Sequence, residues 1–154
     1  MRILFATGNE YKILEAREML EPLGHSVEGL VINGLRPNFD EPKHLGLDGV
    51  AESKIRQAME LIQGSELEGS AILVEDSGIF LDAFPEWPGA ESSDVEKEIG
   101  LNGIIEKVKE SGNSGAEYRA VAILSNENQV WKSKGICRGK ISDHPRGSNG
   151  FGYD

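Results

Sequence analysis

An apolar run that ends in two adjacent acids constrains this chain most. Ala71-Ile72-Leu73-Val74 is followed at once by Glu75-Asp76-Ser77-Gly78. The apolar run is typical of a strand buried on both faces, and the two carboxylates are costly to bury unless something pairs with them. We expect the strand to end at the acids and the chain to turn at Ser77 and Gly78. Ligands of open α/β sheets collect at the carboxyl ends of strands, so this turn is predicted to hold a metal ion or a general base.

The composition describes one ordinary soluble domain. The chain has 154 residues, of which 38% are hydrophobic and 27% are charged. That length suits a single domain with a real core. The net charge of −10 argues against a general nucleic-acid or membrane binder, because phosphate backbones need a basic face. It leaves room for a small phosphorylated ligand, which a few lysines and a divalent cation can hold.

Cysteine usage and apolar runs bear on the compartment. Cys137 is the only cysteine, and its mid-strand position favours a packing role. No apolar run approaches the roughly 20 residues of a membrane span. We therefore expect a cytoplasmic protein.

Hydrophobic periodicity predicts the order of elements. Strands are expected at 3–6, 27–32, 71–74, 118–125 and 130–141, with the last two forming a hairpin. A first helix carries Ile13, Ala16, Leu20 and Leu23 on one face and is closed by Pro22 and Gly24. A long loop over 33–47 leads to a second helix capped by Asp48, and a third helix runs over 95–108 with a weak point at Gly100. The prolines 85 and 88 mark an irregular stretch. This order predicts an α/β domain with a mixed sheet.

The segment from Thr7 to Lys12 follows the first strand and opens the first helix. Free amide groups and the helix dipole make such junctions anion sites. Gly8 lets the backbone approach a ligand, Asn9 can cap the helix, and Lys12 can reach back over the first turn. The alternative is a capped helix with a solvated lysine.

Two further groups of residues could carry chemistry. Lys54 lies in or beside the apolar stripe of the second helix, so it either extends to water or points at an anion. Glu75 and Asp76 are either a solvated strand end or ligands of Mg²⁺, which takes one or two carboxylates together with phosphate oxygens. Asp40 or Glu41 could supply a second carboxylate. The three histidines show no paired spacing, so zinc is not expected.

The last residues space an aromatic ring with glycines. Gly150 and Gly152 flank Phe151, and Tyr153 and Asp154 follow. Small neighbours leave a ring face open, as base stacking requires. The alternative is a hairpin-like loop with packed aromatic side chains.

Taken together, these segments resemble the inosine triphosphate pyrophosphatase family, which hydrolyses ITP, dITP and XTP to the monophosphate and pyrophosphate. The matching pieces occur in the family's order: Thr7-Gly8-Asn9 with Lys12, Ala51 to Lys54, Glu75 to Phe80, Pro88-Gly89 with Ser92-Ser93, and Arg146-Gly147 with Gly150 to Asp154. Each piece is weak alone, and the ordered set is specific.

The resemblance implies an elongated mixed sheet flanked by helices, two lobes with a central substrate cleft, and a homodimer. It implies that Thr7, Gly8, Asn9, Lys12 and Lys54 bind the triphosphate, and that Ser77 and Gly78 touch phosphate or sugar. Asp76 would activate the attacking water and hold Mg²⁺ together with Glu41. The purine would lie on Phe151, with Gly152, Tyr153 and Asp154 beside it.

The chain departs from the family in two ways. Residues 1–154 are expected to form a single domain that lacks the family's closing helix and a Ser-His-Arg segment that helps to bind the base. Ala90-Glu91 replaces the aromatic residue that commonly follows Pro-Gly. Beside the pyrophosphatase activity, two alternatives therefore remain: a non-enzymatic nucleotide-binding remnant or dimerisation partner, and a related pyrophosphatase for modified pyrimidine nucleotides. Loss of a closing helix also predicts a lower stability than in full-length relatives.

Overall fold

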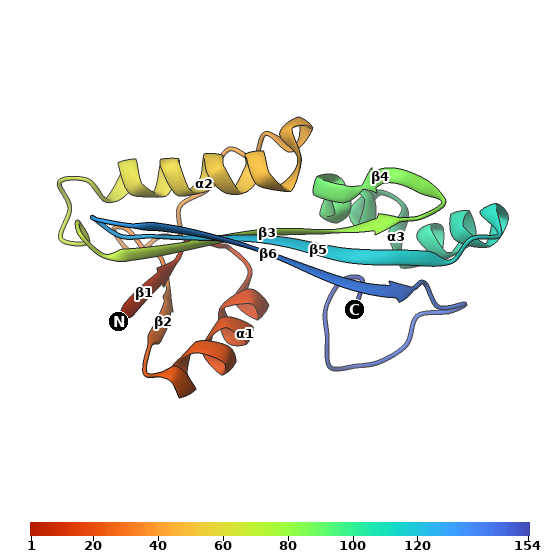
Figure 1. Cartoon of the computed structure of the whole chain (residues 1–154), viewed down its shortest axis with the longest axis horizontal. Helices are drawn as coiled ribbons and strands as arrows, with labels where there is room; N and C mark the ends of the chain where they lie inside the picture. Colours follow the sequence, from red (N-terminus) through yellow and green to blue (C-terminus); the bar gives the residue numbers. More distant parts are fainter.

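A six-stranded mixed sheet runs the length of the molecule (Figure 1). The computed structural model describes all residues 1–154. The strands are β1 (Arg2–Phe5), β2 (Ser26–Gly29), β3 (Ala71–Leu81), β4 (Phe84–Pro88), β5 (Gly115–Ser125) and β6 (Val130–Lys140). The helices are α1 (Glu10–Leu20), α2 (Gly46–Ile62) and α3 (Ser92–Ser111), with short 3-10 turns η1 (Glu21–Leu23), η2 (Lys43–Leu45) and η3 (Gly89–Glu91). The predicted mixed α/β fold is confirmed.

The pairing of the strands leaves a gap on one edge of β3. The strand order is β2-β1-β3-β5-β6, with β1 parallel to both β2 and β3 and the β3-β5-β6 pairs antiparallel. β1 pairs with β3 only as far as Leu73, and β4 pairs with the same strand only from Phe80. The intervening edge of β3 has no neighbouring strand. It is there that the first loop of the chain passes.

The strand β3 is longer than the sequence pattern predicted. It continues through Glu75, Asp76, Ser77 and Gly78 to Leu81, so the prediction of a turn at Ser77 and Gly78 is wrong. A Cβ atom on Gly78 would lie 2.0 Å from the carbonyl oxygen of Gly89. The glycine therefore marks a close approach of η3 to the strand rather than a turn. The acids lie in the middle of a strand, beside the carboxyl end of its neighbour β1.

Several helix boundaries follow the predicted signals. Asn9 caps α1 by accepting a hydrogen bond from the backbone of Tyr11, and Gly24 ends the η1 turn with a φ of 85°. The third helix bends at Gly100, the predicted weak point, where φ is 67°. Asp48 lies inside the first turn of α2 rather than at its cap, and Leu23 is exposed rather than packed. The stretch with two prolines forms β4, which the sequence analysis did not predict.

Three apolar clusters hold the layers together. α2 packs on one face of the sheet through residues such as Ala51 and Ala58, and α1 packs on the other face through Ile13 (Figure 1). The third cluster joins α3 to the far end of β3 and β5. Each helix thus covers part of a face of the same sheet, and the gap beside β3 lies between the α1 and α2 layers.

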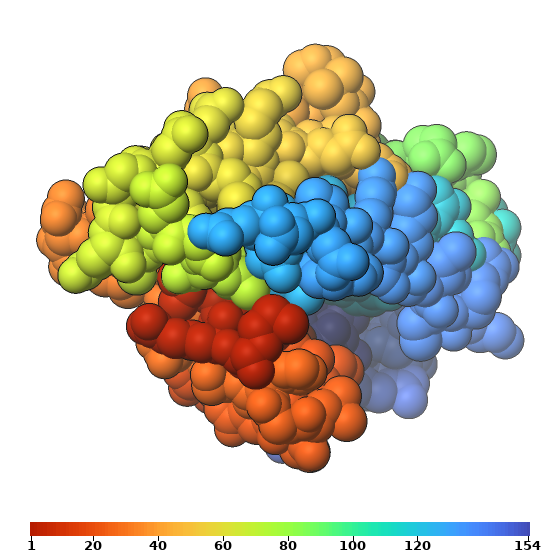
Figure 2. Space-filling model, turned by 60° about the vertical axis from the view of Figure 1, so that its left-hand side comes forward, coloured from red at the N-terminus to blue at the C-terminus, as the bar shows by residue number.

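The hairpin strand β6 lies at the surface. All of its residues are exposed, and Figure 2 shows the end of this hairpin between the N-terminal part of the chain and α2. Cys137 is exposed as well, so the predicted packing role for this residue is wrong. None of the helices combines the length and the apolar character needed to cross a membrane.

Candidate functional site

A cleft of about 820 Å³ opens where the sheet has its gap. Its walls come from the β1–α1 loop, the loop before α2, α2 itself, β3, the start of α3 and the C-terminal loop. Most of the side chains singled out from the sequence line it: Thr7, Gly8, Asn9, Lys12, Glu41, Lys54, Asp76, Ser77, Phe151, Gly152 and Tyr153. Residues as far apart in the chain as Thr7 and Tyr153 therefore share one cavity.

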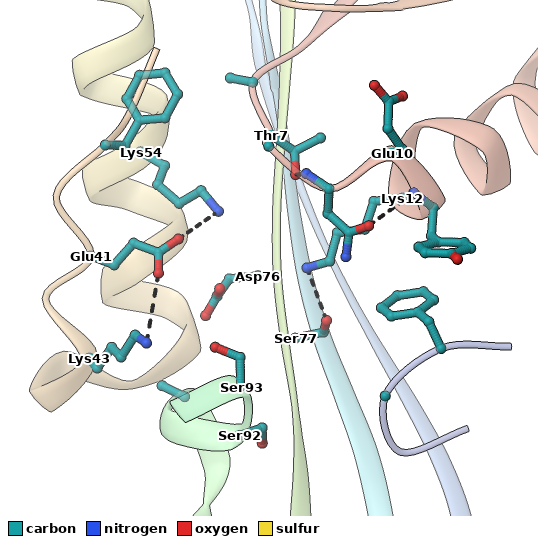
Figure 3. Close-up of a pocket in the computed structure, with 18 of the residues that line it drawn as sticks. Thr7, Glu10, Lys12, Glu41, Lys43, Lys54, Asp76, Ser77, Ser92 and Ser93 are labelled. Atoms are coloured by element: carbon teal, nitrogen blue, oxygen red, sulfur yellow. Dashed lines mark hydrogen bonds and ion pairs between the residues drawn. The ribbon is translucent and has the colours of Figure 1, made fainter. Parts of the chain in front are cut away.

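The gap explains how neighbouring residues of a strand reach the same cavity. Asp76 and Ser77 point to opposite faces of β3, because side chains alternate along a strand. Asp76 faces the side covered by α2, and Ser77 faces the side covered by α1. Because no strand pairs with this edge, both side chains line the cleft. Figure 3 shows Lys54 and Lys43 on one wall and Lys12 on the opposite wall, with Asp76 between them.

Lys12 is held on the α1 side of the cleft. Its Nζ lies 2.5 Å from Glu75 Oε2 and donates a hydrogen bond of 3.3 Å to Ser77 Oγ. The loop before it is ordered by local bonds, since Thr7 Oγ1 accepts from the amide of Asn9 at 3.1 Å. The first turn of α1 thus presents a lysine to the cavity at a helix N-terminus, which is an arrangement that anions favour. The lysine is not solvated along a free helix face, as one alternative held.

Lys54 approaches the same acids from α2. Its side chain is buried, and its Nζ lies 3.2 Å from Glu41 Oε1 and 3.2 Å from the carbonyl oxygen of Glu75. Lys54 therefore points at a carboxylate and a backbone carbonyl rather than extending to water. Glu41 also faces Lys43, whose Nζ forms a 2.5 Å ion pair with Asp94 of α3.

The structure distinguishes the two loop acids geometrically. Glu41 lines the cleft, whereas Asp40 does not. The backbone of Asp40 is fastened to α2, because its amide and carbonyl both bond to the side chain of Gln57 at 2.9 Å. This anchoring directs the next residue inward.

Among the aspartate and glutamate side chains, Asp76 has the most strongly shifted pKa. It is 9% exposed, and its Oδ2 atom is buried without any hydrogen-bond partner. Burial raises the pKa of Asp76 from its ordinary value to about 7, although Lys54 and Lys12 oppose the shift. An unpaired buried carboxylate oxygen is costly, which suits a site that becomes complete only when a cation or a proton arrives.

The cleft is lined by as many acidic as basic side chains. Four cations line it, namely Lys12, Arg36, Lys43 and Lys54, and four acids line it, namely Glu10, Glu41, Asp76 and Glu96. Arg36 pairs closely with Glu10 at the rim. A polyphosphate would therefore need additional positive charge. No group of three or more His, Cys, Asp and Glu side chains forms a metal cage, which fits a cation that takes only one or two carboxylates from the protein.

Aromatic side chains line the other end of the cleft. The rings of Tyr11 and Phe151 stack with centroids 5.1 Å apart and an interplanar angle of 15°. One face of Phe151 is therefore covered by Tyr11, which corrects the expectation of an open ring. Tyr153 donates a 2.8 Å hydrogen bond to the carbonyl of Ser92, and burial raises its pKa to about 12. Burial likewise raises the pKa of Tyr118.

Two predicted residues lie outside the cleft. Gly78 packs against η3, and Asp154 accepts a 3.0 Å hydrogen bond from the amide of Phe151 at the end of the loop. Other residues line the cleft although no sequence pattern predicted them, among them Tyr11, Arg36, Lys43 and Tyr118. Tyr11 precedes the predicted Lys12 in the same helical turn, and this proximity could have indicated that it lines the cleft. The others depend on tertiary contacts.

Comparison with known proteins finds one family and many similar sequences. The pattern of the Ham1 family matches residues 3–154. A dITP/XTP pyrophosphatase of Hyperthermus butylicus is 34% identical over 152 residues, which cover 99% of this chain and 74% of that protein. A dITP/XTP pyrophosphatase of Thermococcus kodakarensis is 33% identical over 154 residues, which cover 100% of this chain and 77% of that protein. The chain thus spans about three quarters of the length of these relatives.

A solved structure shares the fold. The Ham1 protein of Staphylococcus aureus superimposes with a TM-score of 0.74, over 100% of this chain and 79% of that one, at 24% sequence identity. At this identity the match supports the architecture alone. It agrees with the elongated mixed sheet described above.

Proposed function

This chain belongs to the Ham1 family, and we propose that it is a nucleoside triphosphate pyrophosphatase. The substrates are non-standard purine nucleotides, ITP, dITP and XTP, which are hydrolysed to the monophosphate and pyrophosphate. The observation that carries the proposal is the buried, unpaired Asp76 between lysines from two walls of one cleft. The names of the relatives favour this enzyme over a non-enzymatic remnant and over a pyrimidine-specific enzyme.

The phosphate chain lies between the two walls. Lys12 and the amide of Gly8 bind it from the α1 side, and Lys54 binds it from the α2 side. Both lysines are within ion-pair distance of an acid in the free protein, so each exchanges that partner for a phosphate oxygen. Asn9 keeps the first turn of α1 closed through its cap, which holds the N-terminus of the helix in place.

Mg²⁺ fits the acidic centre of the cleft. The unpartnered Oδ2 of Asp76 and the inward-facing Glu41 are the residues that would hold it. When bound, the ion neutralises phosphate charge and stabilises the departing pyrophosphate. The equal numbers of cations and acids in the cleft support this assignment, because a triphosphate adds negative charge that the protein alone does not balance.

Asp76 acts as the general base. It accepts a proton from a water molecule as the water oxygen bonds to the α-phosphorus, and the bond from that phosphorus to the bridging oxygen breaks. Pyrophosphate leaves with the bonding electron pair, and the nucleoside monophosphate remains. A base with a pKa of about 7 is half-ionised at neutral pH, which is the range where proton transfer is most efficient. Lys12 and Lys54 stabilise the charge that develops on the leaving group.

The remaining parts of the proposal concern the base and the whole protein. Phe151 binds the purine ring, with Gly152 and Tyr153 beside it. We further propose that residues 1–154 form a single domain, that two copies associate as a homodimer, and that the enzyme acts on the cytoplasmic nucleotide pool. These points rest on the resemblance to the family.

A substrate panel tests the activity. Purified protein is incubated with Mg²⁺ and ITP, XTP, ATP, GTP or dTTP, and released pyrophosphate is measured. We expect release from ITP and XTP well above the other three, and a loss of about 100-fold or more in Asp76→Asn. Retained ITP binding without pyrophosphate from any substrate would favour the non-enzymatic alternative. Equal rates in wild type and Asp76→Asn would contradict the role of Asp76, and preference for dTTP would contradict the purine assignment.

A further inference from the structure

The stacked pair of Tyr11 and Phe151 is not part of the hydrophobic core. Neither ring belongs to any of the three apolar clusters, and Tyr11 is 57% exposed. Both rings nevertheless line the cleft. They come from opposite ends of the chain, one from the first turn of α1 and the other from the C-terminal loop. The contact therefore contributes to the wall of the site rather than to the interior.

The position of Tyr11 relates it to the phosphate site. It directly precedes Lys12, and successive residues of a helix diverge by about 100°. Lys12 points to β3, where it contacts Glu75 and Ser77. Tyr11 points to the C-terminal loop, where it meets Phe151. One helical turn thus joins the cationic end of the cleft to its aromatic end, and Tyr11 is held at a constant offset from the phosphate-binding lysine.

The loop that carries Phe151 is anchored to α3 through Tyr153 and has a glycine on each side of the ring. Tyr153 is anchored to the carbonyl of Ser92, whereas glycines flank Phe151 on both sides. Gly152 has a φ of 59°, a conformation that glycine adopts without strain. The backbone of Phe151 bonds to Asp154 of the same loop, whereas the backbone of Tyr11 is part of α1.

We propose that Tyr11 is a second base-binding residue and that the purine ring inserts between Tyr11 and Phe151. This inference rests on the proposed function. The two rings lie nearly parallel, the orientation in which a flat ring stacks on both. At a centroid distance of 5.1 Å they touch each other in the free protein, so entry of the base separates them by movement of the glycine-flanked loop. In the free protein each ring covers one face of the other, and the bound base takes the place of this contact.

Equilibrium binding of the two reaction products tests the proposal without turnover. IMP carries the base, and pyrophosphate in the presence of Mg²⁺ probes only the phosphate half of the site. Tyr11→Leu removes the ring, and Tyr11→Phe is the matched control that keeps it. Both ligands are titrated calorimetrically into the wild type and into each variant. Because the side chain of Tyr11 is exposed, we expect both variants to fold, and the pyrophosphate titration checks this directly.

In Tyr11→Leu we expect the dissociation constant for IMP to rise roughly five- to tenfold, as loss of one stacking face predicts. The constant for pyrophosphate should stay within about twofold in both variants, and Tyr11→Phe should bind IMP like the wild type. Unchanged IMP binding in Tyr11→Leu would overturn the proposal. Tighter IMP binding would also overturn it, because Tyr11 would then be a shield that the base must displace. If the wild type bound neither product, the proposed function would fail and this inference with it.

Discussion

At the scale of single residues, the surroundings of Asp76 determine its chemistry. The residue lies on the buried face of β3, with Lys54 and Glu41 on one side and Lys12 and Glu75 beyond the strand. Burial disfavours its charged form more strongly than the lysines favour it, so its pKa is raised to about 7. Burial thus makes the charged form of this carboxyl group unfavourable, and the same shift gives it a pKa suited to a general base at neutral pH.

The activity should depend on the ionisation of Asp76. Because the base must be unprotonated, we expect kcat/KM at low Mg²⁺ to rise with pH through an apparent pKa near 7. A bound cation favours the ionised carboxylate, so higher Mg²⁺ should move this rise to lower pH. Rates measured between pH 5 and 9 at two Mg²⁺ concentrations check both effects. A rate that is independent of pH in that range would contradict the assignment.

Asp76→Asn should stabilise the metal-free protein. Between the ordinary pKa of 3.8 and the native value of about 7, the native state binds more protons than the unfolded chain. The free energy of unfolding of the wild type therefore falls as pH rises across this window, by roughly 2–4 kcal/mol. Asparagine avoids this loss. Thermal unfolding with a chelator present should show a higher midpoint for the variant at pH 8 and a difference that shrinks toward pH 4. A less stable variant at pH 8 would argue against a buried charge.

Glu41 and Asp40 form a matched pair for testing the second metal ligand. Glu41 faces the cleft, whereas Asp40 is exposed and held through its backbone. Glu41→Gln should raise the Mg²⁺ concentration for half-maximal activity by roughly tenfold, because a carboxylate is a stronger ligand than an amide for this ion. Asp40→Asn should change it by less than about twofold. Mg²⁺ titrations of pyrophosphate release check this pair, and a larger effect at Asp40 would reverse the assignment.

At the scale of elements, the site depends on how three segments meet at β3. β1 stops beside Leu73 and β4 begins beside Phe80, so the edge between them is open. η3 approaches the same strand closely, and the buried Ser92 fixes it there by accepting a hydrogen bond from Ile79 and donating one to Gly89. These contacts position the start of α3 as one wall of the cleft.

Gly78→Ala tests the close approach of η3. The added methyl group would lie 2.0 Å from the carbonyl oxygen of Gly89, so η3 must move. We expect a loss of about 1–3 kcal/mol in the free energy of unfolding, typical of overpacking. Gly135→Ala in β6 is the control, because nothing lies within 4 Å of its added Cβ atom. Denaturant unfolding of both variants checks the difference, and equal stabilities would show that η3 adapts freely.

On the scale of the whole molecule, an acidic protein carries a cleft of balanced charge. The net charge is −10, yet the cleft contains as many cations as acids. The lysines placed in the cleft thus offset the negative potential of the whole protein at the point where an anionic ligand must bind. The edge strand β6 carries Lys132, Lys134, Arg138 and Lys140, and such charges protect an exposed sheet edge from indiscriminate pairing.

The proposed homodimer is tested on the intact chain. Sedimentation equilibrium at micromolar concentration should give a mass twice that of one chain. Repeating the run at high salt separates an apolar interface from an ionic one, because salt screens exposed ion pairs and strengthens apolar association. A monomeric mass at all concentrations would contradict the proposal.

Local signals predicted much of the fold. The helices, the hairpin and the kink at Gly100 follow from periodicity and glycine positions, because these depend on near neighbours. The length of β3 was missed, since Ser77 and Gly78 have the composition of a turn. Only the nearby backbone of η3 explains the glycine there. β4 was missed for a related reason, because prolines disfavour strands unless the strand lies at an edge.

The sequence by itself determined the chemical groups and their order: the Thr7–Lys12 junction, Lys54, the acids before Ser77, and Phe151 between glycines. These are local patterns, and local patterns specify residue types and short-range geometry. Tertiary structure alone decided which groups share the cleft. The gap between β1 and β4 opens both faces of β3 to one cavity, where Asp76 is buried without a hydrogen-bond partner for Oδ2. The C-terminal loop returns to the first turn of α1, which places Tyr11 on Phe151. Such contacts join distant segments, so no pattern within a short stretch contains them.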